Sequence, residues 1–593
     1  MTTPIPRVPW QVTGNHWVSL PCIHPGDASI HCIGGVNARL RSAVEFAGGA
    51  EFIDGSAAPL IRISLEVDGE RVALGREGIA WERESGWIPS FSARVGELAV
   101  RGIICAPHGR QLDISGAVIA LSVENRASES VTVGVGLEGT LGHRQTRVRT
   151  PRVYGDGHNV AAGPDSSVVL DGTDVESHMA IAIGGEGHFD IGLMESSGSW
   201  TLGRSVSVPA GATSDTHFHV AAGFERDGAA AMLRTMRRHG GAALIDASRN
   251  LLREISPATG NAGADRLIAR HAFFCYFGSV VRALDDSRWY IVRSRLPWND
   301  DGLTIRDWHA LMWILPAVQL VDQSLAREVL LRICELHGYE PGSGVHYLDG
   351  SVFEPGFSLE GAAAFAVAVD AYIVETSDDK VVEEPMLAES LYASHEDMER
   401  RRHSQYPLYS TDVNPDGSVP ALRYTMHSNA VAALAFDILR HTLDEKTAEK
   451  VEDPAAVRAS LSRQFSMTTN GKTAFAVAAD LAGNVSSEDN SAASLYWLPY
   501  FDFVERDDST YRRTVKPLDG ITPGSLEVRV ARLIGPSAND AFDWLRRAAL
   551  DGGLAARNVD EDGRATSGGG DAALSGLIAR TIWYAVNVLG VRG

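Results

Sequence analysis

The sequence predicts a multidomain β + α protein, with an N-terminal antiparallel β-sandwich of the super-sandwich type, a helical linker and a C-terminal (α/α)6 barrel. Short runs with alternating apolar residues recur from about residue 17 to 222. A helical stretch broken by two glycines follows, and from about residue 263 helical runs alternate with long polar loops. A chain of 593 residues is too long for one core. We therefore expect domains at 1–225, 226–262 and 263–593.

The β pattern consists of runs such as LIRISLEV, LAVRGIIC and VTVGVGLEG, separated by turn clusters such as VDGE and PAGATSD. Many short, evenly spaced strands are typical of two packed antiparallel sheets. This part shows neither a Gly-rich phosphate loop nor a catalytic constellation. We therefore expect the sandwich to shape the mouth of a pocket or to mediate dimerisation.

The linker stretch RDGAAAMLRTMRRHGGAALIDASRNLLREI has a helical period and a break at Gly240–Gly241. Beyond it, few charges interrupt 359–374 or 571–589, which indicates buried helices. Long Gly- and Pro-rich loops between helices are uncommon unless they are functional. Concentric rings of helices, with a pocket built by loops at one end, fit this pattern.

Composition narrows the classes of function. The formal charge of −21 argues against a nucleic-acid or anionic-membrane surface. The N-terminus lacks a signal-peptide core and no run approaches the roughly 18 apolar residues of a membrane span, so we expect a cytoplasmic protein. Five scattered cysteines without CxxC or HExxH spacing predict no disulfide framework, and we expect no metal or cofactor.

The stretch LPWNDDGLTIRDWHALMW, residues 296–313, is the strongest candidate site. Trp298 and Trp308 bracket acidic residues that include Asp300 and Asp307. Indole faces and fixed carboxylates suit a sugar ring, which offers apolar C–H faces and hydroxyl donors. Arg306 can hold Asp307 ionised at a helix start. The alternative is an ordinary ion pair at a helix N-terminus.

Four stretches carry a resemblance: LTIRDWHAL, VFEPGFSLEGAAAFAV, NPDGSVPALRYTMHSNAVAAL and SSEDNSAASLYWLPYFDF. They resemble segments of (α/α)6-barrel glycoside hydrolases, above all the metal-independent exo-α-1,6-mannosidases (glycoside hydrolase family 125) and the amylo-α-1,6-glucosidase/debranching-like proteins. The predicted architecture is similar to that of the bacterial glucoamylases and sugar phosphorylases. The resemblance implies a carbohydrate enzyme with its site in the barrel.

The resemblance also implies roles for particular residues. Arg306 and Asp307 would hold the sugar nearest the cleaved bond, and the third stretch would carry the general acid. The family's acidic pair falls near Gly417 and Ser418, one residue from Asp416. Where the family has a His-Glu pair that supplies the base, this chain reads Ala-Arg-Asn at 556–558. The predicted substrate-binding residues are Trp298, Asp300, Arg306, Asp307, Trp308, Glu354, Glu360, Arg423, His427, Glu488 and Asp489.

Inverting cleavage of a glycoside needs a protonated carboxyl at the leaving oxygen and a carboxylate that activates water. For the acid we favour Asp416, then Asp412, although Asp416-Gly417 also fits a simple turn. Glu561 and Asp571 are the candidates for the base. The alternative for Glu561 is a solvated turn, and the alternative for Asp571 is a helix N-cap.

These patterns predict a metal-independent, inverting glycoside hydrolase that cleaves a terminal sugar from an oligosaccharide or glycoside, as a possible homodimer. One alternative is a carbohydrate-binding or regulatory protein that has lost catalysis, which the missing glutamate near Ala556 favours. Another is a carbohydrate lyase in which His309, His427 or Tyr424 acts as the base.

Overall fold

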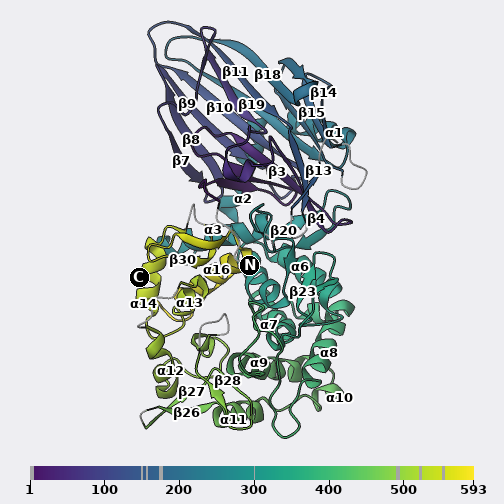
Figure 1. Ribbon diagram of the computed structural model, residues 1–593, viewed down its shortest axis with the longest axis vertical. Helices are drawn as coiled ribbons and strands as arrows, with labels where there is room; N and C mark the ends of the chain where they lie inside the picture. The colour runs from purple at the N-terminus through teal and green to yellow at the C-terminus, as the bar shows by residue number, and fades with distance from the viewer. Residues whose placement is uncertain are drawn as a thin grey trace.

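The computed structural model describes residues 6–147, 151–154, 158–172, 178–299, 301–469, 471–488, 494–519, 524–550 and 554–592. Antiparallel sheets make up the N-terminal part and helices make up most of the C-terminal part, and the two parts lie end to end (Figure 1). Asp300 and Asp489 fall outside the described residues.

Three antiparallel sheets form the sheet region among the described residues. One has the order β1-β2-β3-β4-β12-β13, the second β14-β15-β16-β19-β10-β9-β8-β7, and the third β17-β18-β11-β5-β6. The strands are β1 (Gln11–Gly14), β2 (Val18–Ile23), β3 (Ile30–Asn37), β4 (Ser42–Ala47), β5 (Arg62–Val67), β6 (Glu70–Val72), β7 (Ile79–Glu84), β8 (Ile88–Val95), β9 (Leu98–Cys105), β10 (Gly116–Asn125), β11 (Val131–Thr140), β12 (His143–Arg147), β13 (Pro151–Tyr154), β14 (His158–Gly163), β15 (Ser167–Gly172), β16 (Ala180–Gly185), β17 (Asp190–Met194), β18 (Ser199–Val208) and β19 (Thr213–Gly223).

The alternation of apolar residues explains how these sheets pack. Along β10 and β19, Ile119 pairs with Phe218, and both side chains are buried. The same core contains Phe46 of the first sheet and Val133 of the third. Because successive side chains of a strand point to opposite faces, alternate residues of β10 enter this shared core.

Two helices follow the last strand, α1 (Arg226–His239) and α2 (Gly241–Glu254). Gly240 between them has a φ of +81°, a conformation that glycine adopts without strain. Helix α1 packs on β19 and β16, and α2 packs on β10. The predicted domain boundaries fall beside these elements and stay a prediction.

The helical region contains segments of very different length. They are α3 (Ala262–Phe274), η3 (Cys275–Ser279), α4 (Asp307–His309), η4 (Ala310–Ile314), α5 (Leu315–Gln319), α6 (Gln323–His337), α7 (Leu359–Thr376), α8 (Pro385–Glu399), α9 (Met426–Thr442), α10 (Glu445–Ala448), α11 (Pro454–Gln464), η6 (Leu495–Trp497), α12 (Ser509–Asp519), α13 (Leu526–Ala531), α14 (Ala538–Arg547) and α16 (Ala572–Asn587). Short strands join some of them, including β20 (Val280–Arg282), β21 (Trp289–Ile291), β22 (Thr304–Ile305), β23 (Val345–Tyr347), β24 (Val352–Glu354), β25 (Tyr424–Thr425), β28 (Ala478–Ala479), β30 (Ala556–Val559) and β31 (Ala565–Gly569).

Packing between the helices closes a ring. Within the described residues, the continuous segment α4-η4-α5 contacts α7, then α7 contacts α9, α9 contacts η6, η6 contacts α13, α13 contacts α16, and α16 returns to η4 and α5. Helices α3, α6, α8, α11, α12 and α14 each pack against members of this inner ring. Figure 1 shows the helices arranged around a centre, with α7 and α9 on one side and α13 and α14 on the other.

The sheet and helical regions share a second hydrophobic core. Trp87, next to β8, stacks on Phe277 of η3 with ring centroids 5.4 Å apart. Val118 of β10, Leu244 of α2 and Phe274 of α3 belong to the same buried cluster. Within the described part of the chain, no helix is long and apolar enough to cross a membrane.

Candidate functional site

The N-terminal ends of the inner-ring helices gather the charged and aromatic side chains. Asp307 begins α4, Glu360 lies in the first turn of α7, His427 in that of α9, and Glu527 in that of α13, while Asp571 caps α16. Helix N-termini carry partial positive charge and free N–H groups, so acidic side chains are favoured there. Four of these five positions were predicted from the sequence, and Glu527 was not.

The loop before α4 is tightly folded. Asn299 N–H donates to the Leu296 carbonyl at 3.0 Å, and Gly302 N–H donates to the Asn299 carbonyl at 3.1 Å. The Trp298 indole N–H donates to the Gly569 carbonyl at 3.1 Å, which joins this loop to β31. Trp298 is buried beside the segment that leads into α16.

Charged side chains from distant segments meet beside this loop, and we call the set of Arg293, Arg306, Glu354, Asp416, Glu527, Arg557 and Asp571 the charged cluster. Arg293 Nε donates to Asp571 Oδ2 at 2.7 Å. The Arg306 guanidinium lies 3.9 Å from Glu354 Oε2, and the Arg557 guanidinium lies 3.9 Å from Asp416 Oδ2. Glu527 lies within the electrostatic reach of Asp416, Arg557, Asp571 and Arg293.

Glu527 has the most unusual carboxyl of the cluster. Burial, together with the negative charge of Asp416, raises the pKa of Glu527 to about 8. The residue nevertheless keeps part of its surface exposed, so it is accessible as well as surrounded by protein. Ser525 caps α13 in front of it by accepting from Val528 N–H. This raised pKa favours the protonated, neutral form of Glu527 at pH 7.

Sequence reasoning missed Glu527 for a physical reason. It sits in GSLEVRVA, where a glutamate behind a capping serine is an ordinary helix start. Helix α13 has only six residues, too few to show a helical period. The only feature of the nearby sequence that could have indicated Glu527 is its position two residues after the capping Ser525. The charges that shift its pKa come from other segments of the chain.

Asp416 lies in the loop between α8 and β25. Its Oδ1 accepts from Ser418 N–H at 2.9 Å and from Ser418 Oγ at 2.6 Å, and its side chain is 28% exposed. Gly417 has a φ of +87°, and a Cβ there would lie 2.3 Å from the Arg306 guanidinium. Glycine therefore permits both the turn and the close approach of Arg306 to this loop.

The other carboxylates predicted for catalysis have different surroundings. Asp412 pairs with Arg401 at 2.8 Å and with the exposed Arg423 at 3.4 Å. Glu561 is exposed at the turn between β30 and β31. Asp571 is buried, and its Oδ1 accepts from Ala573 N–H as the N-cap of α16. Burial opposes its ionisation, but Arg293 holds the pKa of Asp571 below its ordinary value.

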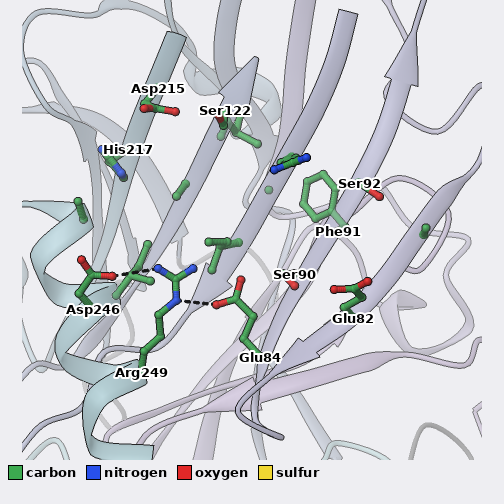
Figure 2. A pocket seen from close by; sticks show the side chains of 18 residues that line it. Glu82, Glu84, Ser90, Phe91, Ser92, Ser122, Asp215, His217, Asp246 and Arg249 are labelled. Atoms are coloured by element: carbon green, nitrogen blue, oxygen red, sulfur yellow. Dashed lines mark hydrogen bonds and ion pairs between the residues drawn. The ribbon is translucent and has the colours of Figure 1, made fainter. Parts of the chain in front are cut away.

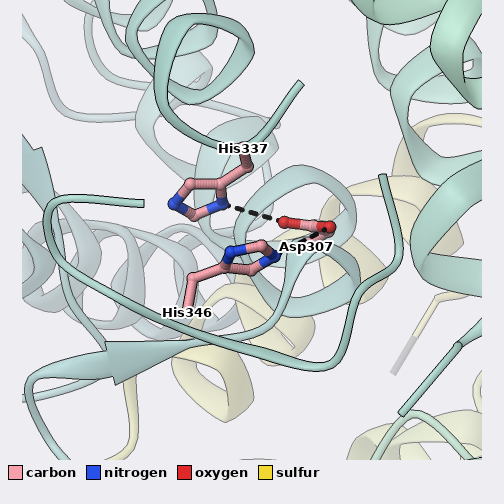
Figure 3. A group of neighbouring side chains, drawn as sticks. All are labelled: Asp307, His337 and His346. Carbon is pink, nitrogen blue, oxygen red and sulfur yellow. Dashed lines mark hydrogen bonds and ion pairs between the residues drawn. The ribbon is translucent and has the colours of Figure 1, made fainter. Parts of the chain in front are cut away.

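Asp307 is enclosed by two histidines (Figure 3). His337 Nδ1 donates to Asp307 Oδ1 at 2.8 Å, and Gly342 N–H donates to Oδ2 at 2.8 Å. His346 Nε2 lies 3.5 Å from Oδ2, while its Nδ1 donates to the Gly350 carbonyl at 3.0 Å. All three side chains are about 1% exposed. A role of Asp307 in sugar binding stays a prediction.

The atoms of Asp307, His337 and His346 lie within 4.8 Å of one another, and two imidazoles with a carboxylate can bind a transition metal. The two rings, however, are stacked, with centroids 4.3 Å apart and planes 12° apart. A metal bound by both imidazoles would have to lie in the plane of each ring. Two stacked, nearly parallel rings have no common position of that kind next to their nitrogens. The arrangement fits an ion pair better, because Asp307 raises the pKa of His346 against the effect of burial, whereas burial lowers that of His337.

A second buried group lies at the starts of α7 and α9. Glu360 accepts from Ser428 Oγ at 2.6 Å, and His427 Nδ1 lies 3.4 Å from Glu360 Oε1. The Trp308 ring meets the His427 ring edge-on, with centroids 5.5 Å apart. These three predicted substrate-binding side chains are almost completely buried. Glu488, by contrast, is exposed.

His309 belongs to the surroundings of the charged cluster. Burial and the nearby charges of Arg293 and Arg306 hold the pKa of His309 well below its ordinary value. Its imidazole is therefore neutral at pH 7. A role of this ring as a base, as in a lyase, stays a prediction.

A separate groove of about 670 Å³ lies on the outer face of β7, β8, β9, β10 and β19, beside α2 (Figure 2). Arg249 of α2 closes one end through ion pairs with Glu84 at 2.6 Å and Asp246 at 3.0 Å. None of its lining residues belongs to the predicted site. The candidate site is therefore the charged cluster rather than this groove.

No protein-family model and no curated protein matches the chain. Solved structures do match its fold. A bacterial glucoamylase in complex with acarbose aligns over 100% of this chain and 95% of its own, with a TM-score of 0.63 and 9% identity. A putative kojibiose phosphorylase from the human microbiome aligns over 97% and 86%, with a TM-score of 0.57 and 11% identity.

A metal-independent α-mannosidase from Streptococcus pneumoniae, in a non-productive complex with α-1,6-mannobiose, aligns over 57% of this chain and 99% of its own. Its TM-score is 0.46 at 12% identity. The glucoamylase and the phosphorylase confirm the resemblance of fold that the predicted architecture indicated, and at these identities it is a likeness of fold alone.

Proposed function

We propose that the chain is a glycoside hydrolase with a β-sandwich and an (α/α)6 barrel, and that its active site is the charged cluster. The closed inner ring of helices, with outer helices packed on it, supports the barrel. The core shared by the three sheets supports the sandwich. The likeness of fold to a glucoamylase and a sugar phosphorylase supports a carbohydrate substrate.

One arrangement carries the proposal: Glu527 lies beside Asp416 in a cluster whose other carboxyls lie against arginines, and burial raises the pKa of Glu527 to about 8. Carboxyls whose surroundings separate their protonation states are the usual acid and base of glycoside cleavage. Glu527 would donate its proton to the leaving oxygen. Asp416, partly exposed and close enough to raise the pKa of Glu527, would take a proton from the attacking water.

Other members of the cluster would bind the substrate. The Arg306 guanidinium offers N–H donors, and Glu354, 44% exposed, offers acceptors for sugar hydroxyls. Trp298 would contribute an aromatic edge. The reaction needs no metal in this scheme, and inversion at the anomeric carbon follows if water attacks directly. Asp412, Glu561 and Asp571 remain candidates for the acid or base by the earlier sequence argument.

The test is a screen of the protein against aryl glycosides and unmodified oligosaccharides. NMR identifies the anomer of the released sugar, and each assay is repeated in the presence of EDTA. Turnover with inversion that survives EDTA would support the proposal. Glu527→Gln should lose activity on oligosaccharides but keep much of it on glycosides with an activated leaving group, which need no protonation. If Asp416→Asn shows that pattern instead, the two roles are exchanged.

Phosphorolysis is a second candidate, because three guanidiniums lie in the cluster and that of Arg557 is 49% exposed. Arginine binds phosphate in a bidentate way, and bound phosphate could replace water as the nucleophile. The same screen with and without inorganic phosphate decides this, since a sugar phosphate would appear only in phosphorolysis. Sugar binding without any turnover would favour a binding protein.

A further inference from the structure

An arginine of the sheet region holds the loop that carries Trp298. Arg147, the last residue of β12, is completely buried where the sheet region meets the helical region. Its Nη1 donates to the Asn299 carbonyl at 2.9 Å, and its Nη2 donates to the Leu296 carbonyl at 3.3 Å. One guanidinium thus binds both carbonyls that border the Leu296–Asn299 turn.

The sheet region also compensates the charge of this guanidinium. Arg147 Nη2 lies 3.1 Å from Glu45 Oε1 of β4, and Glu45 is 1% exposed. Glu45 Oε2 in turn accepts from the Gln145 side chain. A buried ion pair is maintained only with good geometry and further hydrogen bonds, and this pair has both. Figure 1 shows β4 at the end of the sheet region that faces the helices.

The opposite side of the turn contacts the segment that leads into the charged cluster. Trp298 bonds to the Gly569 carbonyl, and a Cβ on Gly570 would lie 1.9 Å from the Leu296 side chain. The next residue, Asp571, binds Arg293. A continuous path of contacts therefore runs from Arg147, through the turn, to the Arg293–Asp571 ion pair.

We propose that Arg147 is a positioning residue: the sheet region fixes the Leu296–Asn299 turn, and with it Trp298 and the Arg293–Asp571 pair, relative to Glu527. A guanidinium suits this task because its planar fork holds two carbonyls in a fixed geometry, whereas the ammonium of lysine is a point charge on a flexible stem. The effect on turnover rests on the proposed function, whereas the effect on the turn does not.

The experiment uses the full chain with the paired substitution Glu45→Gln/Arg147→Met, which removes the two carbonyl donors without leaving a buried charge. Arg204→Met is the matched control, because Arg204 donates to a backbone carbonyl inside the sheet region, that of Glu186 at 3.0 Å. Hydrogen exchange reads the amides of Ser294, Asn299 and Gly302, which bond within this loop.

We expect the paired variant to exchange these amides at least ten-fold faster than the native protein, while Arg204→Met leaves them unchanged. On the substrate found by the screen, kcat/KM should fall at least ten-fold in the paired variant and stay within two-fold in Arg204→Met, measured below the Tm of every variant. Displacing binding groups by about 1 Å is enough for such a loss.

Unchanged exchange in the turn would overturn the proposal, as would faster exchange with unchanged kcat/KM. If the native protein turns over nothing, the proposed function fails, but the exchange data still decide whether Arg147 holds the turn. If the paired variant does not fold, Arg147→Lys replaces it. At least a three-fold rise in exchange is then expected, and no rise would count against the proposal.

Discussion

Two opposing effects act on the carboxyl of Glu527. A helix N-terminus favours its ionised form by roughly 0.3–1 kcal/mol. Burial and the charge of Asp416 oppose ionisation, and a pKa of about 8 shows that they outweigh the helix, since each pKa unit is about 1.4 kcal/mol. The outcome is a proton held at neutral pH beside an accessible surface, which is the property that a general acid needs.

Replacing Glu527 by glutamine should lower kcat on an unactivated glycoside by about 10²–10⁴-fold, because the leaving oxygen would lose its proton donor. KM should change little. The alkaline limb of the native pH–rate profile, expected near pH 8, should disappear in the variant. Steady-state kinetics between pH 5 and 10 measure both effects.

Glu505→Gln, at an exposed position of the helical region, serves as the control and should behave like the native protein. Glu561→Gln tests the earlier assignment of the base to the β30–β31 turn. If Glu561→Gln abolishes turnover and Glu527→Gln does not, Glu527 has no catalytic role.

The same carboxyl makes stability depend on pH. The pKa of Glu527 is higher in the folded state than its ordinary value of 4.5. The contribution of this carboxyl to the free energy of unfolding is therefore fully present below pH 4.5 and is lost as the pH rises through about 8. Glu527→Gln should therefore gain stability relative to the native protein between pH 5 and 9, by up to roughly 3 kcal/mol after allowing for partial exposure. Urea unfolding at pH 5, 7 and 9 measures this, and a constant difference would contradict it.

The sequence could name individual residues as site candidates, but it could not show which side chains contact them. Arg306 and Asp416 could be predicted as site candidates because a motif surrounds them, and both lie in the charged cluster. For Asp307 the sequence predicted a carboxylate that Arg306 holds ionised; its pKa is held low, but by His346 and His337, while Arg306 lies against Glu354. The two histidines that hold it lie 30 and 39 residues further along, at positions that only the fold brings together.

At the scale of elements, Asp571 performs two tasks at the start of α16, as N-cap and as partner of Arg293. Asparagine caps a helix nearly as well as aspartate but carries no charge. Asp571→Asn should therefore destabilise mainly by leaving Arg293 buried without its partner, by about 3–5 kcal/mol. The double variant Arg293→Met/Asp571→Asn should recover most of that loss. Denaturant unfolding of the three proteins tests this, and additive losses would show that the ion pair is unimportant.

The Asp307 group connects α4, α6 and the strand β23. Because Asp307 raises the pKa of His346 above its ordinary 6.5, the stability that His346 contributes is fully present below pH 6.5 and declines as the pH rises through the raised value. His346→Gln should thus cost more stability at pH 6 than at pH 9. His239→Gln, on an exposed position of α1, should show no such difference. Chemical unfolding at pH 6 and pH 9 measures the loss in unfolding free energy caused by His346→Gln. An equal loss at the two pH values would contradict the prediction.

The long elements could be predicted from periodicity and the short ones could not. The runs 359–374 and 571–589, predicted to be buried helices, correspond to α7 and α16. Residues 264–284 also have a helical period, but there the helix ends in the π-turn η3 and the strand β20, because Val280–Arg282 pairs with Trp289–Ile291. A pairing between strands outweighs helical propensity there, and a window of single-chain periodicity does not contain the partner strand.

At the scale of the whole molecule, the two regions were predicted as separate domains because the hydrophobic period changes near residue 226. The structure places apolar side chains of both regions in one buried cluster, where Trp87 stacks on Phe277. The sequence could show which residues are apolar but not which core they enter. The hydrophobic period therefore changes abruptly near residue 226, whereas the buried cluster continues from one region into the other.

This shared core predicts cooperative unfolding of the whole chain. Separating the regions would expose Trp87, Val118, Phe274 and Phe277 to water at about 25 cal/mol for each Å² of apolar surface, and would break the buried Arg147–Glu45 contact with the loop. Differential scanning calorimetry should give one transition whose calorimetric and van't Hoff enthalpies agree. A fragment of residues 263–593 should lack that transition, since its α3–η3 face would lose its cover. Two resolved transitions in the full chain, or a stable fragment that melts cooperatively, would mean that each region is stabilised by its own core and that the interface only docks them.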